Sequence, residues 1–271
     1  MSPIMFKIGN IGIRWYSVLI LIAFIIGYIL VITRARKKGI SGVYVSDISL
    51  YLIIFCIIGA RLYYCLFNMD YYKDNLVEIL MIWRGGLAIH GGIIAGIIVL
   101  TIYTKKYQIG FFRMTDIIAP ALALGQAIGR WGNFFNSEAH GIETTYAALK
   151  GYHIPEFIIK GMKIDGVYYH PTFFYESLLC LIGFFIALFL RRRKNIKLTN
   201  ITSFYLIWYG TVRILIEILR TDSLMIGNFK MAIIVSILMI IIGIILFIIS
   251  LTKSKFENKY NDIENVKNIN F

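Results

Sequence analysis

Long apolar runs separated by short polar segments dominate the chain. A helix needs about 20 mostly apolar residues to cross the hydrocarbon core of a bilayer. Runs of about this length occupy 16–33, 46–67, 86–104, 115–136, 172–190, 201–220 and 230–251. The pattern predicts an all-α polytopic membrane protein with about seven transmembrane helices.

The polar segments predict how these spans are organised. Residues 1–253 are expected to form one seven-span transmembrane domain, and the longest connection, 137–171, falls between the fourth and fifth spans. Glycine and proline interrupt that connection and break any long helix. They are Gly141, Gly151, Pro155, Gly161 and Gly166. We therefore expect a small segment outside the membrane there, and a polar cytoplasmic tail over 254–271.

Charge predicts the orientation. The loops on one side of the predicted membrane hold 16 of the 28 lysines and arginines. They are Arg34, Arg36, Lys37, Lys38, Lys105, Lys106, Arg113, Arg191, Arg192, Arg193, Lys194, Lys197, Lys253, Lys255, Lys259 and Lys267. Basic residues beside spans favour the cytoplasmic side. The sequence thus predicts an N-terminus outside and a C-terminus inside. The first span is not expected to be a cleaved signal peptide, because it is too long and basic residues follow it directly.

Composition narrows the function classes. Hydrophobic residues make up 58% of the 271 residues and charged residues 16%, which excludes a disordered chain and a secreted disulfide scaffold. The net charge of +13 lies in clusters between spans, so it indicates topology and anionic lipid rather than nucleic acid. The three cysteines, Cys56, Cys65 and Cys180, all lie in apolar runs and are expected to be small buried hydrophobes.

Ionisable residues inside spans are costly and rarely face lipid. With seven spans, His90 lies about 6 Å and Arg130 about 9 Å inside the outer ends of their helices, by the helical rise. Arg213 lies about 18 Å from the inner end of the sixth span, which is again the outer half. The other candidates are Tyr16, Arg61, Glu138, His170, Glu176 and Glu217. Their shared depth predicts one polar cavity that opens toward the outer leaflet.

The third predicted span, 86–104, contains His90-Gly91-Gly92, and Gly96 follows Gly92 by four residues. Small residues four apart let another helix approach closely. His90 is either a base or hydrogen-bond donor that faces the cavity, or an incidental histidine beside packing glycines. A metal site is not expected, because no second histidine stands at i+4.

The densest polar run is GRWGNFFNSEAHG at 129–141. Arg130 and Asn133 are three apart and share a helix face. The guanidinium is a planar fork of donors that suits a phosphate. Asn133, Asn136 and Glu138 can complete a network around it; the alternative is a structural Arg–Glu pair that only joins helices.

The sixth span carries Tyr209, Arg213, Glu217 and Arg220 on one helix face. The Arg213–Glu217 pair can be internal neutralisation alone. A second arginine at the depth of the first instead favours an anionic ligand that both arginines share.

An outward-opening cavity with two arginines, a histidine and amides suits a phospholipid headgroup. The sequence shows no Ser or Cys triad and no paired carboxylates for water activation, so a transferase is favoured over a hydrolase. Two other classes stay open: an anion or lipid transporter, and a structural membrane scaffold whose intramembrane arginines would tolerate lysine.

Four runs resemble bacterial prolipoprotein diacylglyceryl transferases. They are HGG at 90–92, GRWGNFFNSEAHG at 129–141, HPTFFYES at 170–177 and YGTVRILIEILR at 209–220. Arg14-Trp15-Tyr16 fits as well, and the resemblance covers nearly the whole chain in order. The sequence departs at Phe173, where many relatives carry Gln, and over 142–166, which matches poorly.

The resemblance implies a bacterial plasma-membrane enzyme of lipoprotein biosynthesis. Such an enzyme moves the diacylglyceryl group of phosphatidylglycerol to the lipobox cysteine of a prolipoprotein and releases glycerol 1-phosphate, without a cofactor. It implies catalytic roles for His90, Arg130 and Arg213, with Arg130 on the headgroup. The resemblance also implies substrate-binding or supporting roles for Tyr16, Asn133, Glu138, Gly141, Tyr209 and Glu217.

Overall fold

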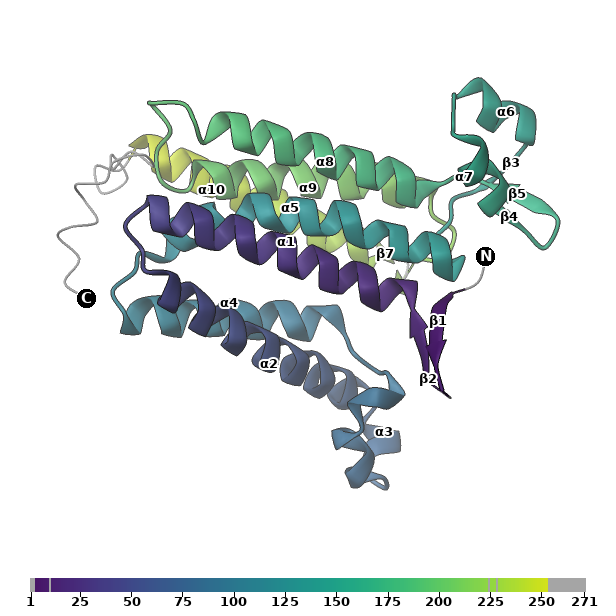
Figure 1. Ribbon diagram of the computed structural model, residues 1–271, viewed down its shortest axis with the longest axis horizontal. Coiled ribbons are helices and arrows are strands. Elements are labelled where there is room, and N and C mark those ends of the chain that lie inside the picture. Colours follow the sequence, from purple (N-terminus) through teal and green to yellow (C-terminus); the bar gives the residue numbers. More distant parts are fainter. Residues whose placement is uncertain (1–2, 10, 224, 228, 253–271) are drawn as a thin grey trace. The chain divides into compact units, whose positions relative to one another are not determined.

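The computed structural model describes residues 3–9, 11–223, 225–227 and 229–252. Seven of its helices are long and apolar enough to cross a membrane, which confirms the predicted all-α polytopic fold (Figure 1). They are α1 (Trp15–Lys37), α2 (Gly42–Phe67), α4 (Ile89–Lys106), α5 (Phe111–Asn136), α8 (Thr172–Leu190), α9 (Asn200–Leu219) and α10 (Met231–Thr252). The predicted tail, 254–271, lies outside the described residues.

Helix boundaries differ from the predicted spans for local reasons. The first helix continues past residue 33 to Lys37, since basic side chains in the last turn of a helix interact favourably with its dipole. The third span begins at Ile89 rather than at residue 86, because Gly85 and Gly86 have φ angles of 87° and 69°. A helix cannot include two consecutive residues in that conformation.

The chain divides into two compact units. Of the described residues, the first unit comprises those within 3–31 and 115–252, and therefore holds most of α1 and α5 together with α8, α9 and α10. The second comprises residues 32–114, and holds α2, α4 and the segment between them.

Small residues set the helix contacts of the first unit. A Cβ on Gly210 of α9 would lie 2.8 Å from the carbonyl oxygen of Ser236 in α10, and one on Gly243 would lie 3.0 Å from that of Ser203. These two glycines therefore let α9 and α10 approach closely. Between α8 and α9 the contact is polar, because Trp208 Nε1 donates a hydrogen bond to the carbonyl of Leu179 at 2.9 Å.

Asp116 joins α5 to the start of α9. Its fully buried carboxylate accepts hydrogen bonds from the backbone N–H groups of Thr199 and Thr202, both at 2.8 Å, and from the Thr202 hydroxyl at 2.5 Å. It satisfies donors that the first turn of any helix leaves without an intrahelical partner. A side chain of one helix thus serves as the N-terminal cap of another.

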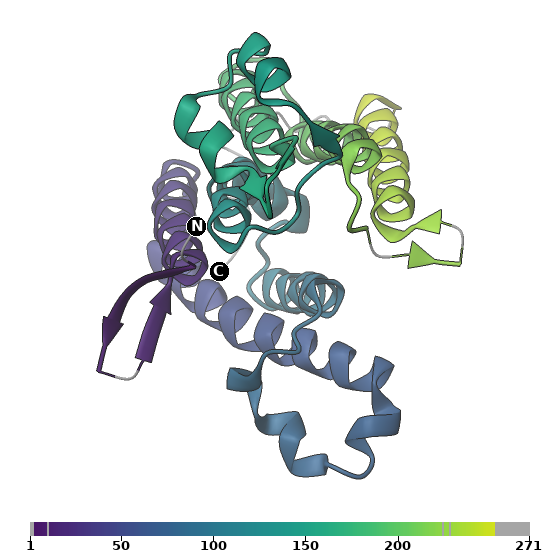
Figure 2. The ribbon, with the colours of Figure 1, turned by 90° about the vertical axis from the view of Figure 1, so that its right-hand side faces the viewer.

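A small subdomain separates α5 from α8 (Figure 2). It contains β3 (Glu143–Thr144), α6 (Tyr146–Gly151), α7 (Glu156–Gly161), β4 (Lys163–Ile164) and β5 (Val167–Tyr169), with antiparallel strands in the order β3–β5–β4. The helices are six residues long, as expected where glycine and proline interrupt the sequence.

The core of this subdomain reaches into the ends of the spans. Its buried members are Phe134, Leu149, Ile154, Ile158, Ile159, Met162 and Phe173. Phe134 of α5 and Phe173 of α8 stack with ring centroids 4.7 Å apart. Phe173, the departure from the resemblance, is therefore a core residue, and its aromatic ring suits the surrounding apolar contacts.

In the second unit α2 and α4 pack through glycines. A Cβ on Gly92 would lie 3.3 Å from the carbonyl oxygen of Cys56, and one on Gly96 would lie 3.1 Å from Cys56 Sγ. The predicted close approach of a helix to Gly92 and Gly96 is thus confirmed. The tightest crossing is at Gly59 and Gly91, where each glycine lies against the backbone of the other.

Residues 68–88 connect α2 to α4 and are called the arm below. The arm contains α3 (Met69–Tyr72) and two short 3₁₀ turns, η1 (Leu76–Leu80) and η2 (Ile82–Arg84). Two short hairpins complete the described structure: β1 (Ile4–Ile8) with β2 (Ile11–Arg14), and β6 (Met225–Ile226) with β7 (Phe229–Lys230).

Candidate active site

Four charged side chains from α5, α8 and α9 meet inside the first unit. Arg130 Nη2 lies 2.7 Å from Glu176 Oε1, and Arg213 Nη1 lies 3.3 Å from Glu176 Oε2. Arg213 Nη2 also lies 2.6 Å from Glu217 Oε2, one turn along α9. We call Arg130, Glu176, Arg213 and Glu217 the arginine–glutamate cluster. It brings together two of the three predicted catalytic residues and one predicted substrate-binding residue.

Spacing on α9 explains why these groups meet. Tyr205, Tyr209, Arg213 and Glu217 recur every four residues and so line one face of the helix. Tyr205 accepts a hydrogen bond from Gln126 at 2.9 Å. Tyr209 lies 3.4 Å from both Arg130 Nη2 and Glu176 Oε1. This face of α9 therefore contacts α5 at two positions, Gln126 and Arg130. It also places Tyr209 beside both Arg130 and Glu176, which form an ion pair.

The charges of the cluster balance. Two guanidiniums face two carboxylates, and both carboxylates are 1% exposed. Removing one partner of such a buried set leaves an uncompensated charge, at a cost of about 3–5 kcal/mol. The complete cluster is therefore electrostatically balanced, and removal of any one of its four side chains should destabilise the folded protein.

This balance revises the interpretation of the two arginines. Their common depth favoured an external anion that both would share, but the anion that joins them in the structure is Glu176. Glu176 comes from a helix whose sequence gives no charge partner at helical spacing, so no local pattern could have revealed the contact. The alternative of an Arg–Glu pair that joins helices is also realised, with Glu176 rather than Glu138 as the partner of Arg130.

Arg130 retains donors for a ligand. Among the described residues, its contacts with Glu176 and Tyr209 both use Nη2. A guanidinium has five N–H donors, so those on Nε and Nη1 remain. The side chain is 21% exposed, in contrast to that of Glu176 at 2%. The cluster can thus accept a further anion on the Arg130 side.

The amides of the 129–141 run form a separate network. Glu138 Oε1 accepts hydrogen bonds from Asn133 Nδ2 at 3.0 Å and from Asn136 Nδ2 at 3.2 Å. The predicted connection among these three side chains is present. This network stabilises the turn that follows α5. In the same turn, the backbone N–H of Glu138 donates a hydrogen bond to the Asn133 carbonyl at 3.1 Å.

Gly141 lies where the subdomain leaves the spans. Its N–H donates to the His170 carbonyl at 2.9 Å, and it forms a β-bridge with Arg220. A Cβ there would lie 2.9 Å from His170 Cβ and 3.0 Å from Thr172 Cγ2, so only glycine fits without movement. The contact places the ends of α5, α8 and α9 in a fixed arrangement.

Burial lowers the pKa of the His170 imidazole, whose Nδ1 forms a hydrogen bond with the Tyr175 hydroxyl at 3.2 Å.

Tyr16 packs on the same end of α5 from α1. The Cβ position of Gly132 is occupied by its ring, so this glycine admits the tyrosine. The neighbouring Trp15 stacks on Phe135 with centroids 4.6 Å apart. Tyr16 is 39% exposed and can reach a ligand beside the helix.

His90 belongs to the second unit, as the second residue of α4. It is half-buried, and its ring centroid lies 6.0 Å from that of Tyr63. The helix start is anchored by a hydrogen bond from the Ala88 N–H to the Ala60 carbonyl at 3.0 Å. Its predicted meeting with the two arginines in one cavity stays a prediction.

Arg61 is held by the backbone rather than by a ligand. Its guanidinium donates to the carbonyls of Glu78 at 2.5 Å, Ile79 at 2.9 Å, Gly85 at 2.8 Å and Gly86 at 3.0 Å. Because it is buried and bonded to four carbonyls, it holds the arm against α2. Its depth near the outer end of the second span predicted a place in the cavity, and the contacts assign it a structural role.

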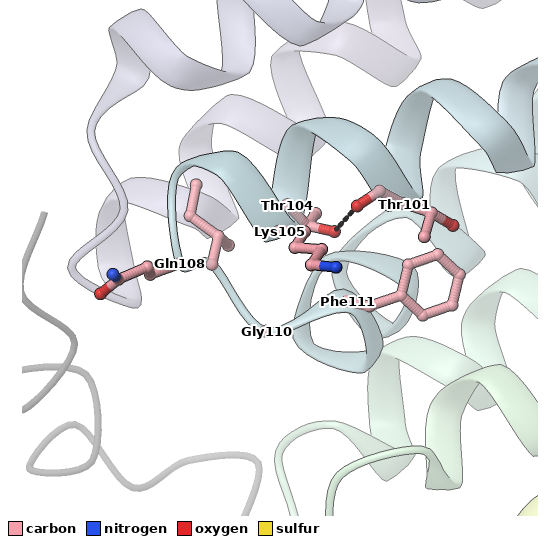
Figure 3. A pocket seen from close by; sticks show the side chains of 7 residues that line it. Thr101, Thr104, Lys105, Gln108, Gly110 and Phe111 are labelled. Atoms are coloured by element: carbon pink, nitrogen blue, oxygen red, sulfur yellow. Dashed lines mark hydrogen bonds between the residues drawn. The ribbon is translucent and has the colours of Figure 1, made fainter.

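Two surface hollows lie away from these groups. One, of about 330 Å³, is lined by Thr101, Thr104 and Lys105 of α4 and by residues 108–111 of the following turn (Figure 3). The other is lined by residues 192–196, after α8. Neither contains a member of the arginine–glutamate cluster. Within the described part of the chain, no three His, Cys, Asp or Glu side chains gather as a metal site would require.

Comparison with known proteins identifies the family. The sequence model of the family described as "Prolipoprotein diacylglyceryl transferase" matches residues 3–249. A protein of Listeria innocua named phosphatidylglycerol–prolipoprotein diacylglyceryl transferase is 45% identical over 248 residues, which cover 92% of this chain and 89% of that protein. Proteins of the same name from Staphylococcus xylosus and Bacillus velezensis are 43% and 42% identical, and each alignment covers 97% of this chain.

These alignments cover 94% and 97% of the Staphylococcus and Bacillus relatives, so the likeness extends over whole proteins. The region matched by the family model includes six complete spans, α10 as far as residue 249, the subdomain and the arginine–glutamate cluster. The chain therefore belongs to the prolipoprotein diacylglyceryl transferase family.

Proposed function

We propose that this protein transfers the diacylglyceryl group of phosphatidylglycerol to a prolipoprotein, in the first step of lipoprotein maturation. The observation that carries this proposal is the identity of about 45% over most of the chain to enzymes of that name. The geometry adds a partly buried pair of arginines suited to a phosphate. The acceptor is the lipobox cysteine that follows the signal peptide.

The reaction balances as a displacement at carbon. The cysteine sulfur forms a bond with the terminal glyceryl carbon of the diacylglycerol unit, and the bond from that carbon to a phosphate oxygen breaks. The electron pair of the broken bond stays on that oxygen, which leaves as glycerol 1-phosphate. The thiol proton passes to a base, and the product is a thioether. Neither an oxidant nor a reductant is needed.

Arg130 and Arg213 stabilise the charge that develops on the leaving phosphate. Preorganised donors are most effective where charge develops in a low-dielectric site. Arg130 binds the headgroup through the donors that Glu176 leaves free. Arg213 is held between two carboxylates, 3.3 Å and 2.6 Å away, and supplies the second positive charge.

Glu176 has a positioning role in this scheme. Its two oxygens fix the two guanidiniums from one side, so the incoming phosphate meets arginines that are already oriented. Tyr209 and Glu217 support the same two cations. The resting site is neutral without substrate. Both Nη atoms of Arg213 already contact carboxylates, so the phosphate competes with Glu176 for that arginine.

His90 is the candidate base for the thiol, or the group that orients it. A free thiol ionises near pH 8.5, so a base assists the reaction at neutral pH. Tyr16, Asn133, Glu138 and Gly141 lie at one end of α5 and shape the binding site for the lipid and the peptide.

The orientation follows from the charged loops. The arginine–glutamate cluster lies in the half of the bundle nearer the end that carries the subdomain. With the N-terminus outside and the C-terminus inside, that end faces outward, where lipoprotein precursors emerge. The loop over 191–197 and its five basic residues then face the cytoplasm.

Replacing Arg130 or Arg213 by lysine should reduce transfer about 100-fold or more, since lysine keeps the charge but loses the planar fork of donors. Purified protein is incubated with phosphatidylglycerol and a lipobox peptide, and the peptide is weighed by mass spectrometry. The wild type should add one diacylglyceryl group to cysteine.

Arg192→Lys, on an exposed loop, is the matched control and should keep full activity. Full activity of both Arg130→Lys and Arg213→Lys would instead support a scaffold. An unmodified peptide with folded wild-type protein would refute the proposed function.

His90→Gln should lower transfer at pH 7 and recover as the pH rises toward about 8.5, where the acceptor thiol ionises unaided. The pH profile of the transfer rate, measured for both proteins, tests this role. A loss that is the same at every pH would show that His90 positions a substrate and does not take the proton.

Cysteine labelling tests the orientation. An impermeant maleimide added to intact cells should label Asp70→Cys in the arm, and should label Lys194→Cys only after the membrane is opened. The native cysteines lie within spans, so the unmodified protein provides the background. Labelling of position 194 in intact cells would reverse the proposed orientation.

A further inference from the structure

The arm has an apolar surface that nothing in the described structure covers. Leu80 and Trp83 are each 76% exposed, and Val77 is 70% exposed. Leu76 and Ile82 are exposed as well. A group of this size is unusual on a surface that faces water and marks a site of interaction.

The arm is also rigidly held. Arg61 of α2 bonds four of its carbonyls, including those of Ile79 and Gly85 on either side of η2. The same guanidinium lies 5.2 Å from the ring centroid of Tyr72 in α3. These contacts supply donors to carbonyls of the short 3₁₀ turns and of Gly85 and Gly86. Backbone groups near the hydrocarbon need such partners within the protein.

The apolar surface of the arm continues that of two spans. Phe67 at the end of α2 is 74% exposed, and Ile89 at the start of α4 is 71% exposed. Both helices qualify as membrane spans, so these side chains face lipid at the membrane boundary. The arm connects these two helix ends (Figure 2, blue).

The polar groups of the arm pair with one another. Glu78 accepts a hydrogen bond from Tyr71 at 2.8 Å and forms an ion pair with Arg84 at 2.5 Å. The Tyr71 hydrogen bond and Arg84 hold the pKa of the Glu78 carboxyl below its usual range. With Lys73 and Arg84 against three acidic residues, the arm has no excess of positive charge to draw it to anionic lipid.

We propose that the arm is an interfacial anchor whose exposed side chains Leu76, Val77, Leu80 and Trp83 insert into the acyl boundary of one leaflet. Amphipathic segments of this kind bury their apolar side about 5–10 Å below the headgroups, and tryptophan favours that depth. The proposed orientation makes this the outer leaflet. Because Ala88 at the end of the arm bonds α2, the anchor also fixes the height at which α4 and His90 begin.

Spin labels on the full-length protein in lipid nanodiscs test the anchor. Leu80→Cys and Val77→Cys should collide several-fold more often with oxygen than with a water-soluble nickel chelate. Asp70→Cys, at a fully exposed position of the same arm, is the matched control and should show the reverse. The background carries alanine at the three native cysteines, which lie within spans.

Salt and lipid charge provide a second criterion. Since burial of apolar surface drives the insertion, the depth at position 80 should be unchanged between neutral and anionic lipid and at high salt. Collision of both position 77 and position 80 with the nickel chelate, at the rate of position 70, would overturn the proposal. It would indicate that this surface faces water and does not insert into the bilayer.

A measurement on the native tryptophan does not depend on the cysteine background. The fluorescence that Trp83→Phe removes should be quenched by lipid brominated near the headgroup and shielded from aqueous iodide. Quenching by iodide alone would also contradict the anchor.

Discussion

The fold depends on charged groups that are satisfied by the protein where neither water nor lipid can satisfy them. In the first unit, Glu176 lies between two arginines from different helices, and Glu217 neutralises the second. Because hydrophobic burial does not drive helices together within lipid, polar contacts and close packing of small residues decide which helices meet. The arginine–glutamate cluster therefore positions α5, α8 and α9 and assembles the candidate site by the same contacts.

The same constraint explains two other groups. Asp116 caps the start of α9 from α5, and Arg61 bonds four carbonyls of the arm. Each places a full charge next to backbone groups that a helix end or a short turn leaves unpaired. Ionisable residues in spans are thus divided between those that build the fold, such as Asp116 and Arg61, and those that keep donors for a ligand, such as Arg130.

The sequence predicted the elements well because spans have a strong, local signal. All seven spans, the interruption of helix after residue 136, the Arg213–Glu217 pair and the Asn133–Glu138 network were predictable from spacing within single segments. The partner of Arg130 was not, since Glu176 stands on another helix 46 residues away. The same limit applied to Arg61, whose partners are backbone carbonyls with no residue type of their own, and to the arm, whose short apolar segments resemble the adjacent spans.

In the proposed function, the arginine–glutamate cluster binds the phosphate of the lipid substrate as well as stabilising the fold. A site that is neutral at rest can remain in a membrane without a bound anion, and its arginines stay oriented for one. In the proposed mechanism, the phosphate of the lipid substrate then replaces the contact of Arg213 with Glu176. This exchange accounts for two carboxylates in a site that must bind an anion.

The most direct measurement compares phosphatidylglycerol binding and transfer in Glu176→Gln with the wild type, per folded protein. Loss of the competing carboxylate should leave lipid binding as tight as in the wild type or tighter, while the transfer rate falls because the guanidiniums lose their common support. Glu156→Gln, at an exposed position of α7, should change neither. Loss of lipid binding in Glu176→Gln would contradict the exchange and would assign Glu176 to the lipid site itself.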